Sequence, residues 1–171
     1  MRYAMLMRGV NVGGVRVPMA ELAELLRSLG VTEVKTVLQS GNAAFDSDAD
    51  AAQLKRTIEP ALSERFGYDA VVHVYPREDV AAVLAAYPFA PAPGRHSYVV
   101  FCADAETARE LAGAPVDADA ETLAAGTGVV YWQVERGATL KTPFAKLLAR
   151  PRYRAVTTNR NVNTLAKLAG A

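Results

Sequence analysis

Three short polar stretches carry the residues of this sequence that are best suited to chemistry. The first, residues 8–14, reads Arg-Gly-Val-Asn-Val-Gly-Gly. Glycines let a backbone expose successive N–H groups to a ligand, and a following helix start favours negative charge. Arg8 would neutralise an anion, the Gly13 and Gly14 backbone would donate hydrogen bonds, and Asn11 is a further candidate. The alternative is a loop that needs glycine only for its backbone angles, with Arg8 on the surface.

The second stretch, residues 39–42, reads Gln-Ser-Gly-Asn. Its side chains offer neutral donors and acceptors, so Gln39, Ser40 and Asn42 are candidates for orienting a polar ligand. The same four residues are also typical of a tight turn between two strands, which needs no ligand.

The third stretch predicts a helix from about Arg160 to Ala169. Its apolar stripe would be Val162, Leu165, Ala166 and Ala169, and its polar stripe Arg160, Asn163, Thr164 and Lys167. A cation at a helix N-terminus opposes the macrodipole by a few tenths of a kcal/mol. Arg160 is therefore expected either to bind a carboxylate or phosphate or to pair with an acidic residue. Asn161, Asn163 and Thr164 are the further ligand-binding candidates of this stretch.

Other catalytic signatures are missing from the sequence. Residues 9–14 lack the Lys-Ser/Thr of a phosphate-binding Walker loop and do not have the dinucleotide spacing. His73 and His96 have no metal-ligand spacing with Cys102, and His73 alternates with valines, as on a sheet face. Cys102 ends an apolar strand and is interpreted as a small buried hydrophobe. We therefore assign no catalytic residue, no metal ligand and no cofactor.

Charge is unevenly distributed along the chain, although the net charge is only +1. After Glu135 there are 8 basic residues and no acidic one, whereas residues 21–135 carry 8 basic and 18 acidic residues. Such asymmetry indicates either an anion-binding surface or the docking of a basic element onto an acidic body. The simpler explanation of this charge distribution is that the basic residues are solvated or paired with acidic ones.

The overall composition is that of a globular protein. The chain has 171 residues, 51% of them hydrophobic, which is enough to bury a core without a metal or disulfide. One cysteine fits a reducing compartment. No apolar run approaches the roughly 18 residues of a membrane span, and the five apolar residues between Arg2 and Arg8 are too few for a secretory signal. We expect a soluble cytoplasmic protein with no membrane partner, as a monomer or a homodimer.

The expected elements follow the order β-α-β-β-α-β twice. Residues 1–75 form the first unit, residues 76–94 a linking helix and a Pro-rich linker, and residues 95–171 the second unit with a C-terminal helix. Pro60 is expected to kink or split the second helix, and residues 155–157 to form the closing strand. This order predicts an α+β fold of two tandem ferredoxin-like units with antiparallel sheets.

The same three stretches resemble the hallmark segments of the DUF1697 family of uncharacterised bacterial proteins. They read Leu-Met-Arg-Gly-Val-Asn-Val-Gly-Gly at 6–14, Gln-Ser-Gly-Asn at 39–42 and Thr-Thr-Asn-Arg-Asn-Val-Asn-Thr-Leu at 157–165. The resemblance implies tandem ferredoxin-like subdomains, between which N-terminal strands can be exchanged, and it implies no known activity. It also shows one departure, because Val162 stands where the family usually has Trp. If Val162 faces the core, the change shrinks a packing residue; if the Trp lines a pocket, a stacking contact is lost.

Three functions are compatible with these residues. The first is binding, with or without turnover, of a small anionic or phosphorylated ligand in a cleft that joins the three stretches. The second is single-stranded nucleic-acid binding through the basic C-terminal third, for which Tyr131, Trp132 and Tyr153 are the nearby aromatic residues. The third is a non-catalytic interaction role.

Overall fold

The computed structural model describes residues 1–11 and 14–171. The elements, in chain order, are β1 (Arg2–Met7), α1 (Met19–Ser28), β2 (Thr32–Val37), β3 (Asn42–Asp46), α2 (Ala51–Phe66), β4 (Val72–Pro76), α3 (Arg77–Ala85), β5 (Arg95–Cys102), α4 (Ala105–Ala112), β6 (Glu121–Ala125), β7 (Val129–Glu135), α5 (Pro143–Leu148), α6 (Pro151–Arg154), β8 (Thr157–Asn161) and α7 (Val162–Ala169).

The chain forms two compact units. The first contains residues 1–82 and 164–171, and the second contains residues 83–163, so the boundaries fall inside α3 and α7. Each unit holds one four-stranded antiparallel sheet, with the strand orders β2-β3-β1-β4 and β6-β7-β5-β8. The predicted tandem ferredoxin-like α+β fold is confirmed. The domain boundaries expected from the sequence, at residues 75 and 95, stay a prediction.

Each sheet is built only of strands from its own half of the chain. β1 pairs with β3 and β4, and β5 pairs with β7 and β8. Among the described residues, the sheets therefore show no exchange of N-terminal strands of the kind that the family resemblance allows. A local pairing of this kind needs no long crossing connection, which is the usual preference of compact folds.

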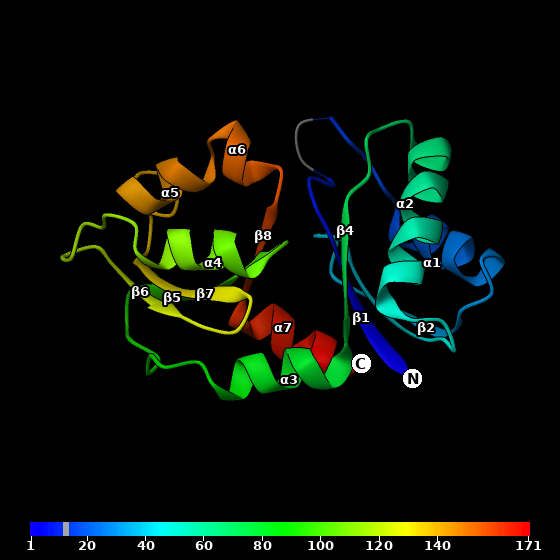
Figure 1. Ribbon diagram of the computed structural model, residues 1–171, viewed down its shortest axis with the longest axis horizontal. Helices are drawn as coiled ribbons and strands as arrows, with labels where there is room; N and C mark the ends of the chain where they lie inside the picture. The colour runs from blue at the N-terminus through cyan, green and yellow to red at the C-terminus, as the bar shows by residue number, and fades with distance from the viewer. Residues whose placement is uncertain (12–13) are drawn as a thin grey trace. The chain divides into compact units, whose positions relative to one another are not determined.

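In the first unit, α1 and α2 lie together against one face of the sheet (Figure 1). α2 begins where the Asp50 side chain accepts a hydrogen bond from Gln53 N at 2.8 Å, and it ends at Gly67 in the left-handed conformation. The sequence analysis expects Pro60 to kink or split this helix, yet α2 runs unbroken. Leu54, Ile58 and Leu62, on both sides of the proline, are buried in one core. Their burial offsets the roughly 3 kcal/mol cost of an internal proline.

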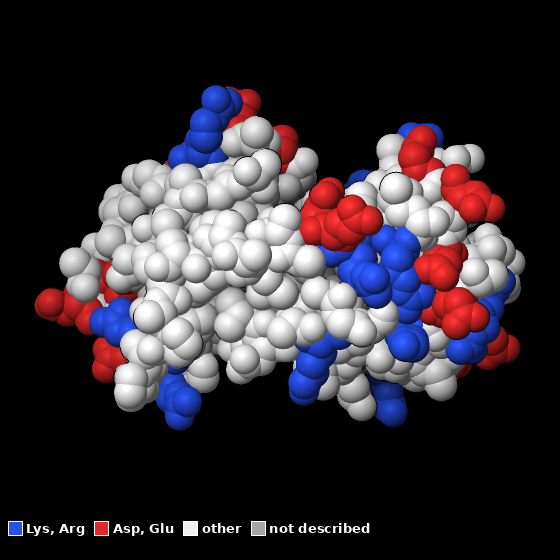
Figure 2. Space-filling view, turned by 90° about the horizontal axis from the view of Figure 1, so that it is seen from below, with Lys and Arg blue, Asp and Glu red and all other residues white. Residues whose placement is uncertain are grey.

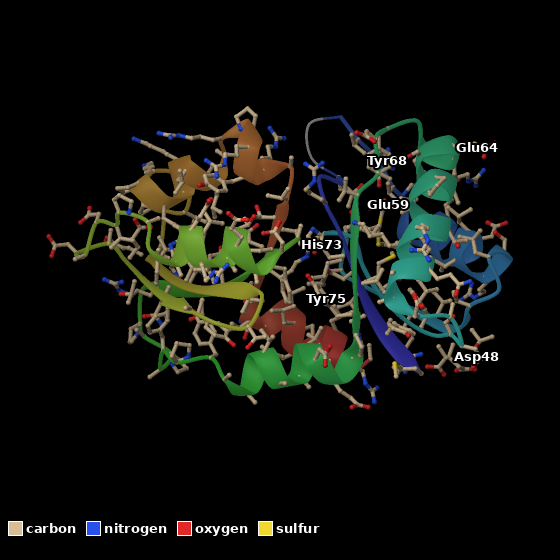
Figure 3. The ribbon with its side chains drawn as sticks, in the orientation of Figure 1. Asp48, Glu59, Glu64, Tyr68, His73 and Tyr75 are labelled. Carbon is tan, nitrogen blue, oxygen red and sulfur yellow. The ribbon has the colours of Figure 1, made fainter. Side chains whose placement is uncertain are left out.

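β4 is one of the two edge strands of the first sheet, and two side chains of α2 bind the backbone of its residue Val72. Lys55 Nζ donates to Val72 O at 2.8 Å, and Glu59 Oε1 accepts from Val72 N at 2.9 Å. Lys55 and Glu59 also pair with each other at 2.9 Å. Figure 3 shows Glu59 reaching from α2 towards β4. Both backbone groups of Val72 on the open side of the strand are thus satisfied within the unit.

The second unit is organised around a buried carboxylate. Glu121, at the start of β6, is 1% exposed and accepts three hydrogen bonds. The donors are Trp132 Nε1 at 3.0 Å, Phe144 N at 3.3 Å and Asp117 N at 3.2 Å. These bonds join β6 to β7, to the first turn of α5 and to the loop before β6. A buried charge is tolerated in a core only when it is satisfied in this way.

The helix ends of the second unit follow local sequence signals. Asp104 caps α4 by accepting from Thr107 N at 2.7 Å, and Thr142 caps α5 by accepting from Ala145 N at 3.2 Å. Trp132 and Phe144 pack together in the core, with ring centroids 5.2 Å apart.

Candidate functional site

The Gly-rich loop leaves β1 at Met7 and is closed by one asparagine. Asn11 N donates to Val15 O at 2.7 Å, and the Asn11 side chain donates to Val17 O at 3.3 Å and accepts from Val17 N at 3.1 Å. Asn11 has a φ of +56°, which asparagine tolerates better than most residues. Gly14 has a φ of +88° and is exposed. Gly13 lies outside the described residues.

The Gln-Ser-Gly-Asn stretch is the connection between β2 and β3. Asn42 is fully buried, and its Nδ2 donates to Val37 O at 2.9 Å and to Ser40 Oγ at 2.7 Å. Gln39 and Ser40 are exposed. The amide of Asn42 therefore supports the turn from inside, whereas Gln39 and Ser40 form its surface.

These two stretches lie side by side in the first unit, although about 28 residues separate them in sequence. Asn11 Nδ2 donates a short hydrogen bond to Gln39 O, and Met7 N donates to Gly41 O at 2.7 Å. Gly41 packs so closely that an added Cβ would meet Val10 Cγ2 at 2.4 Å. Two of the three polar stretches found in the sequence thus contact each other through Asn11, Gln39 and Gly41.

A positive charge and a buried phenol lie at the first of these stretches. Burial raises the pKa of Tyr68 to about 12, and the nearby Arg8 cation opposes that rise. Among the described residues, the Tyr68 hydroxyl has no hydrogen-bond partner. Arg8 is half-buried at the end of β1, where its N–H donates to Val71 O at 3.0 Å. Tyr68, which Figure 3 labels, is a residue that the sequence analysis missed, because only the fold brings it near Arg8.

The opposite face of β4 carries a histidine and a tyrosine. His73 is 6% exposed, and its Nδ1 lies 3.3 Å from Tyr75 Oη. Figure 3 shows both side chains on the side of β4 that faces away from α2. The interpretation of His73 as a sheet-face residue is confirmed. Within the described part of the chain, no group of three or more His, Cys, Asp or Glu residues could hold a metal ion.

Arg160 lies in a strand, so the prediction that it begins a helix is wrong. It belongs to β8, which spans Thr157–Asn161 instead of the expected residues 155–157, and it pairs with Val99 of β5. Arg160 is 8% exposed, and its Nη1 donates to Thr158 Oγ1 and to Asn159 O. Burial lowers the pKa of Arg160 to about 10, so it remains a cation at neutral pH. The macrodipole reasoning therefore does not apply to Arg160.

The C-terminal helix begins two residues later, at Val162. Asn161 Oδ1 accepts from Asn163 N at 2.8 Å and so occupies the capping position. Leu165 and Leu168 are the buried residues of α7, and Val162 is only half-buried, so the predicted apolar stripe is also wrong in part. An Asn directly before an apolar i, i+3 pattern is the signal that would have placed this helix start correctly.

Asn163 is exposed and Thr164 is half-buried. Together with Arg160 and Asn161 they remain predicted ligand-binding residues.

The aromatic residues considered for base stacking are mostly inside the second unit. Tyr131 is 3% exposed and Trp132 is 1% exposed, and the Tyr131 hydroxyl donates to Val83 O at 2.8 Å. Tyr153 is half-buried under the Arg152 guanidinium, 5.0 Å from its ring centroid. A nucleic acid would therefore have to bind through charge, with little stacking.

Several basic residues are paired with acidic ones, as the simpler explanation of the charge distribution expects. Arg2 pairs with Asp46 at 3.2 Å, Arg65 with Glu21 at 3.0 Å and Arg152 with Glu110 at 2.8 Å. Figure 2 shows basic and acidic side chains lying next to each other on the face that it presents.

Cys102 is 5% exposed, and burial, together with the nearby Asp104, raises its pKa to about 12. It is a neutral thiol at physiological pH and a weak nucleophile. The interpretation of Cys102 as a buried hydrophobe is thus confirmed. In the described residues, no helix has the length and apolar character needed to cross a membrane.

Comparison with known proteins gives two findings. The conserved bacterial protein SP0830 from Streptococcus pneumoniae has a similar solved structure, with a TM-score of 0.81 and 28% identity over 99% of this chain and 97% of that one. No curated protein matches the sequence. The family model described as "Protein of unknown function (DUF1697)" matches residues 1–131, which include the Gly-rich loop and the Gln-Ser-Gly-Asn turn but not residues 157–165. The chain therefore belongs to the DUF1697 family.

Proposed function

We propose that this protein binds a small anionic ligand, of the phosphate or carboxylate class, beside the described residues 8–11, Gly14 and 39–42. The observation that carries the proposal is the direct contact between these two stretches, through the Asn11 side chain and Gln39 O. Loops positioned on a rigid sheet are the usual place for binding residues. A contact between two polar, glycine-containing loops gives a ligand donors from both sides.

The residues of this proposed site would have different roles. Arg8 would supply positive charge, and the exposed backbone around Gly14 would supply N–H donors. Gln39 and Ser40 would offer exposed polar side chains. Asn11 and Asn42 would act mainly by holding the loop and the turn, because their amides already bond to backbone carbonyls.

Arg160, Asn161, Asn163 and Thr164 stay predicted ligand-binding residues of the C-terminal segment. Arg160 and Thr164 each have partly or fully buried side chains, so substitution of the exposed Asn163 is the safest test of this part. An Asn163→Ala change that leaves the affinity for an anionic ligand unaltered would refute a ligand-binding role of Asn163.

Replacing Arg8 with glutamine should weaken ligand binding about tenfold or more, because a charge-assisted hydrogen bond contributes roughly 1.5–3 kcal/mol. The measurement is a thermal-shift panel of inorganic phosphate, ribose 5-phosphate and nucleoside monophosphates. A ligand at a hundred times its Kd adds about 2.7 kcal/mol, which raises Tm by roughly 5–10 °C in a protein of this size.

Arg56→Gln is the matched control for Arg8→Gln, since it removes one exposed arginine from α2. The proposal would be contradicted if no compound of the panel raised Tm, or if a ligand raised Tm equally in the Arg8→Gln and Arg56→Gln variants. Release of inorganic phosphate from any ligand that binds would show turnover.

Nucleic-acid binding through the second unit is the second candidate. It is supported by five exposed basic residues on and beside α5 and α6: Lys141, Lys146, Arg150, Arg152 and Arg154. The main proposal predicts no retardation of a single-stranded oligonucleotide at about 50 mM salt. Retardation that falls steeply with added salt, and that a Lys146→Gln, Arg150→Gln double variant abolishes, would favour the second candidate. The double variant Arg27→Gln, Arg56→Gln controls for net charge.

A further inference from the structure

Leu38 combines two features that are unfavourable for stability. It is 49% exposed, and its φ is +57°, the left-handed region that favours glycine. Stability alone would favour Gly or Asn at such a position, as at Gly41 three residues later, where φ is +84°. A leucine there neither relieves the backbone nor gains the full free energy of burial.

The conformation of Leu38 is imposed by the two asparagines of the proposed site. Asn42 Nδ2 donates to Val37 O at 2.9 Å, and Asn11 Nδ2 donates to Gln39 O. The carbonyls of the two residues that flank Leu38 thus each accept a hydrogen bond, one from Asn42 at the start of β3 and one from Asn11 in the Gly-rich loop. Asn11 is itself fixed by its bonds to Val17, and Asn42 is fully buried. Surroundings that determine a strained residue in this way are typical of binding sites.

In the part of the chain that the structure describes, two other non-glycine residues have a positive φ, and both have simpler explanations. Asn11 is of a residue type that tolerates the left-handed region. Glu33 lies in the irregularity of the β2–β3 pairing, where its carbonyl accepts from Arg2 Nη1 at 2.8 Å. Leu38 differs from both, since its turn would form more easily with Gly or Asn and about half of its apolar surface is exposed.

We infer that Leu38 is a specificity-determining contact of the proposed anion site. This inference rests on the proposed function and narrows the ligand class: beside its anionic group, the ligand carries an apolar ring or chain that covers the Leu38 side chain. A nucleoside phosphate and an alkyl phosphate have this chemistry, whereas inorganic phosphate and ribose 5-phosphate lack it. Covering the exposed part of one leucine corresponds to roughly tenfold in affinity.

The test compares Leu38→Asn with wild type by calorimetric titration. Asparagine keeps the left-handed conformation and removes the apolar contact. The probes are the four common nucleoside monophosphates, hexyl phosphate and ribose 5-phosphate. We expect a nucleoside monophosphate or hexyl phosphate to bind wild type about tenfold more tightly than ribose 5-phosphate, and Leu38→Asn to abolish that preference. The affinity for ribose 5-phosphate should stay the same, and Tm should stay the same or rise. If only the nucleoside monophosphates bind wild type more tightly than ribose 5-phosphate, the apolar group of the ligand is a ring. If only hexyl phosphate does, the group is a chain.

Leu140→Asn is the matched control, because Leu140 is 87% exposed in the second unit. Equal affinities for ribose 5-phosphate and all the apolar phosphates would overturn the inference while leaving the proposed function intact. A preference that survives in Leu38→Asn would do the same. Absence of binding by every probe, ribose 5-phosphate included, would overturn both.

Discussion

Glu121→Ala is expected to destabilise the second unit by about 3–5 kcal/mol. The substitution removes the acceptor of Trp132 Nε1, Phe144 N and Asp117 N. Trp132 and Phe144 are buried in the core, whereas Asp117 is exposed. Each donor left without an acceptor in a buried environment costs roughly 1–3 kcal/mol. The loss also leaves a cavity where the side chain was, which adds to the cost.

Trp132 makes this prediction easy to measure, because it is the single tryptophan of the chain and lies in the second unit. Its fluorescence during urea denaturation therefore reports the unfolding of that unit. Glu135→Ala, at the exposed end of β7, is the control and should change the unfolding free energy by less than about 0.5 kcal/mol. A similar small change for Glu121→Ala would show that the three hydrogen bonds contribute little.

Gly41→Ala should destabilise the first unit by about 3 kcal/mol. The new Cβ would lie 2.4 Å from Val10 Cγ2 and 2.9 Å from Met7 Cβ, so the Gly-rich loop and the turn would have to separate. The positive φ of Gly41 adds backbone strain to this steric overlap. Any ligand that binds both stretches should lose affinity in the same variant.

Gly67→Ala separates the two causes of the Gly41→Ala effect. Gly67 also has a positive φ, +69°, but no heavy atom lies within 4 Å of its added Cβ. It should cost only about 1 kcal/mol, from strain alone. Thermal unfolding followed by circular dichroism gives both values, and equal losses in the two variants would refute the packing explanation.

The fold could be predicted from the sequence because its signals are local. Asp50 and Gly67 mark the two ends of α2, Asp104 and Thr142 start α4 and α5, and the strands alternate with helices in a characteristic order. Each of these features depends on residues within one turn of helix or one hairpin.

The errors lie where distant residues decide the conformation. Residues 158–161 form a strand because they pair with β5, which lies about 60 residues earlier in the sequence. No pattern within residues 158–161 predicts this pairing. The loop and the turn contact each other, whereas the gathering of all three polar stretches in one cleft stays a prediction. The left-handed conformation of Leu38, however, depends on amides from Asn11 and Asn42, so its sequence neighbours could not predict it.

The side chains that cover Val72 have a consequence for association between molecules. On β4 the backbone groups that point away from β1 belong to every second residue, which are Val72, Val74 and Pro76. Lys55 and Glu59 occupy the carbonyl and amide of Val72, and Pro76 has no N–H to donate. A foreign β-segment aligned here would find hydrogen-bonding groups at Val74 but no continuous intermolecular ladder. The β4 edge of the first sheet is thereby protected against the addition of further strands from other molecules. Lys55 and Glu59 lose side-chain freedom in providing this protection.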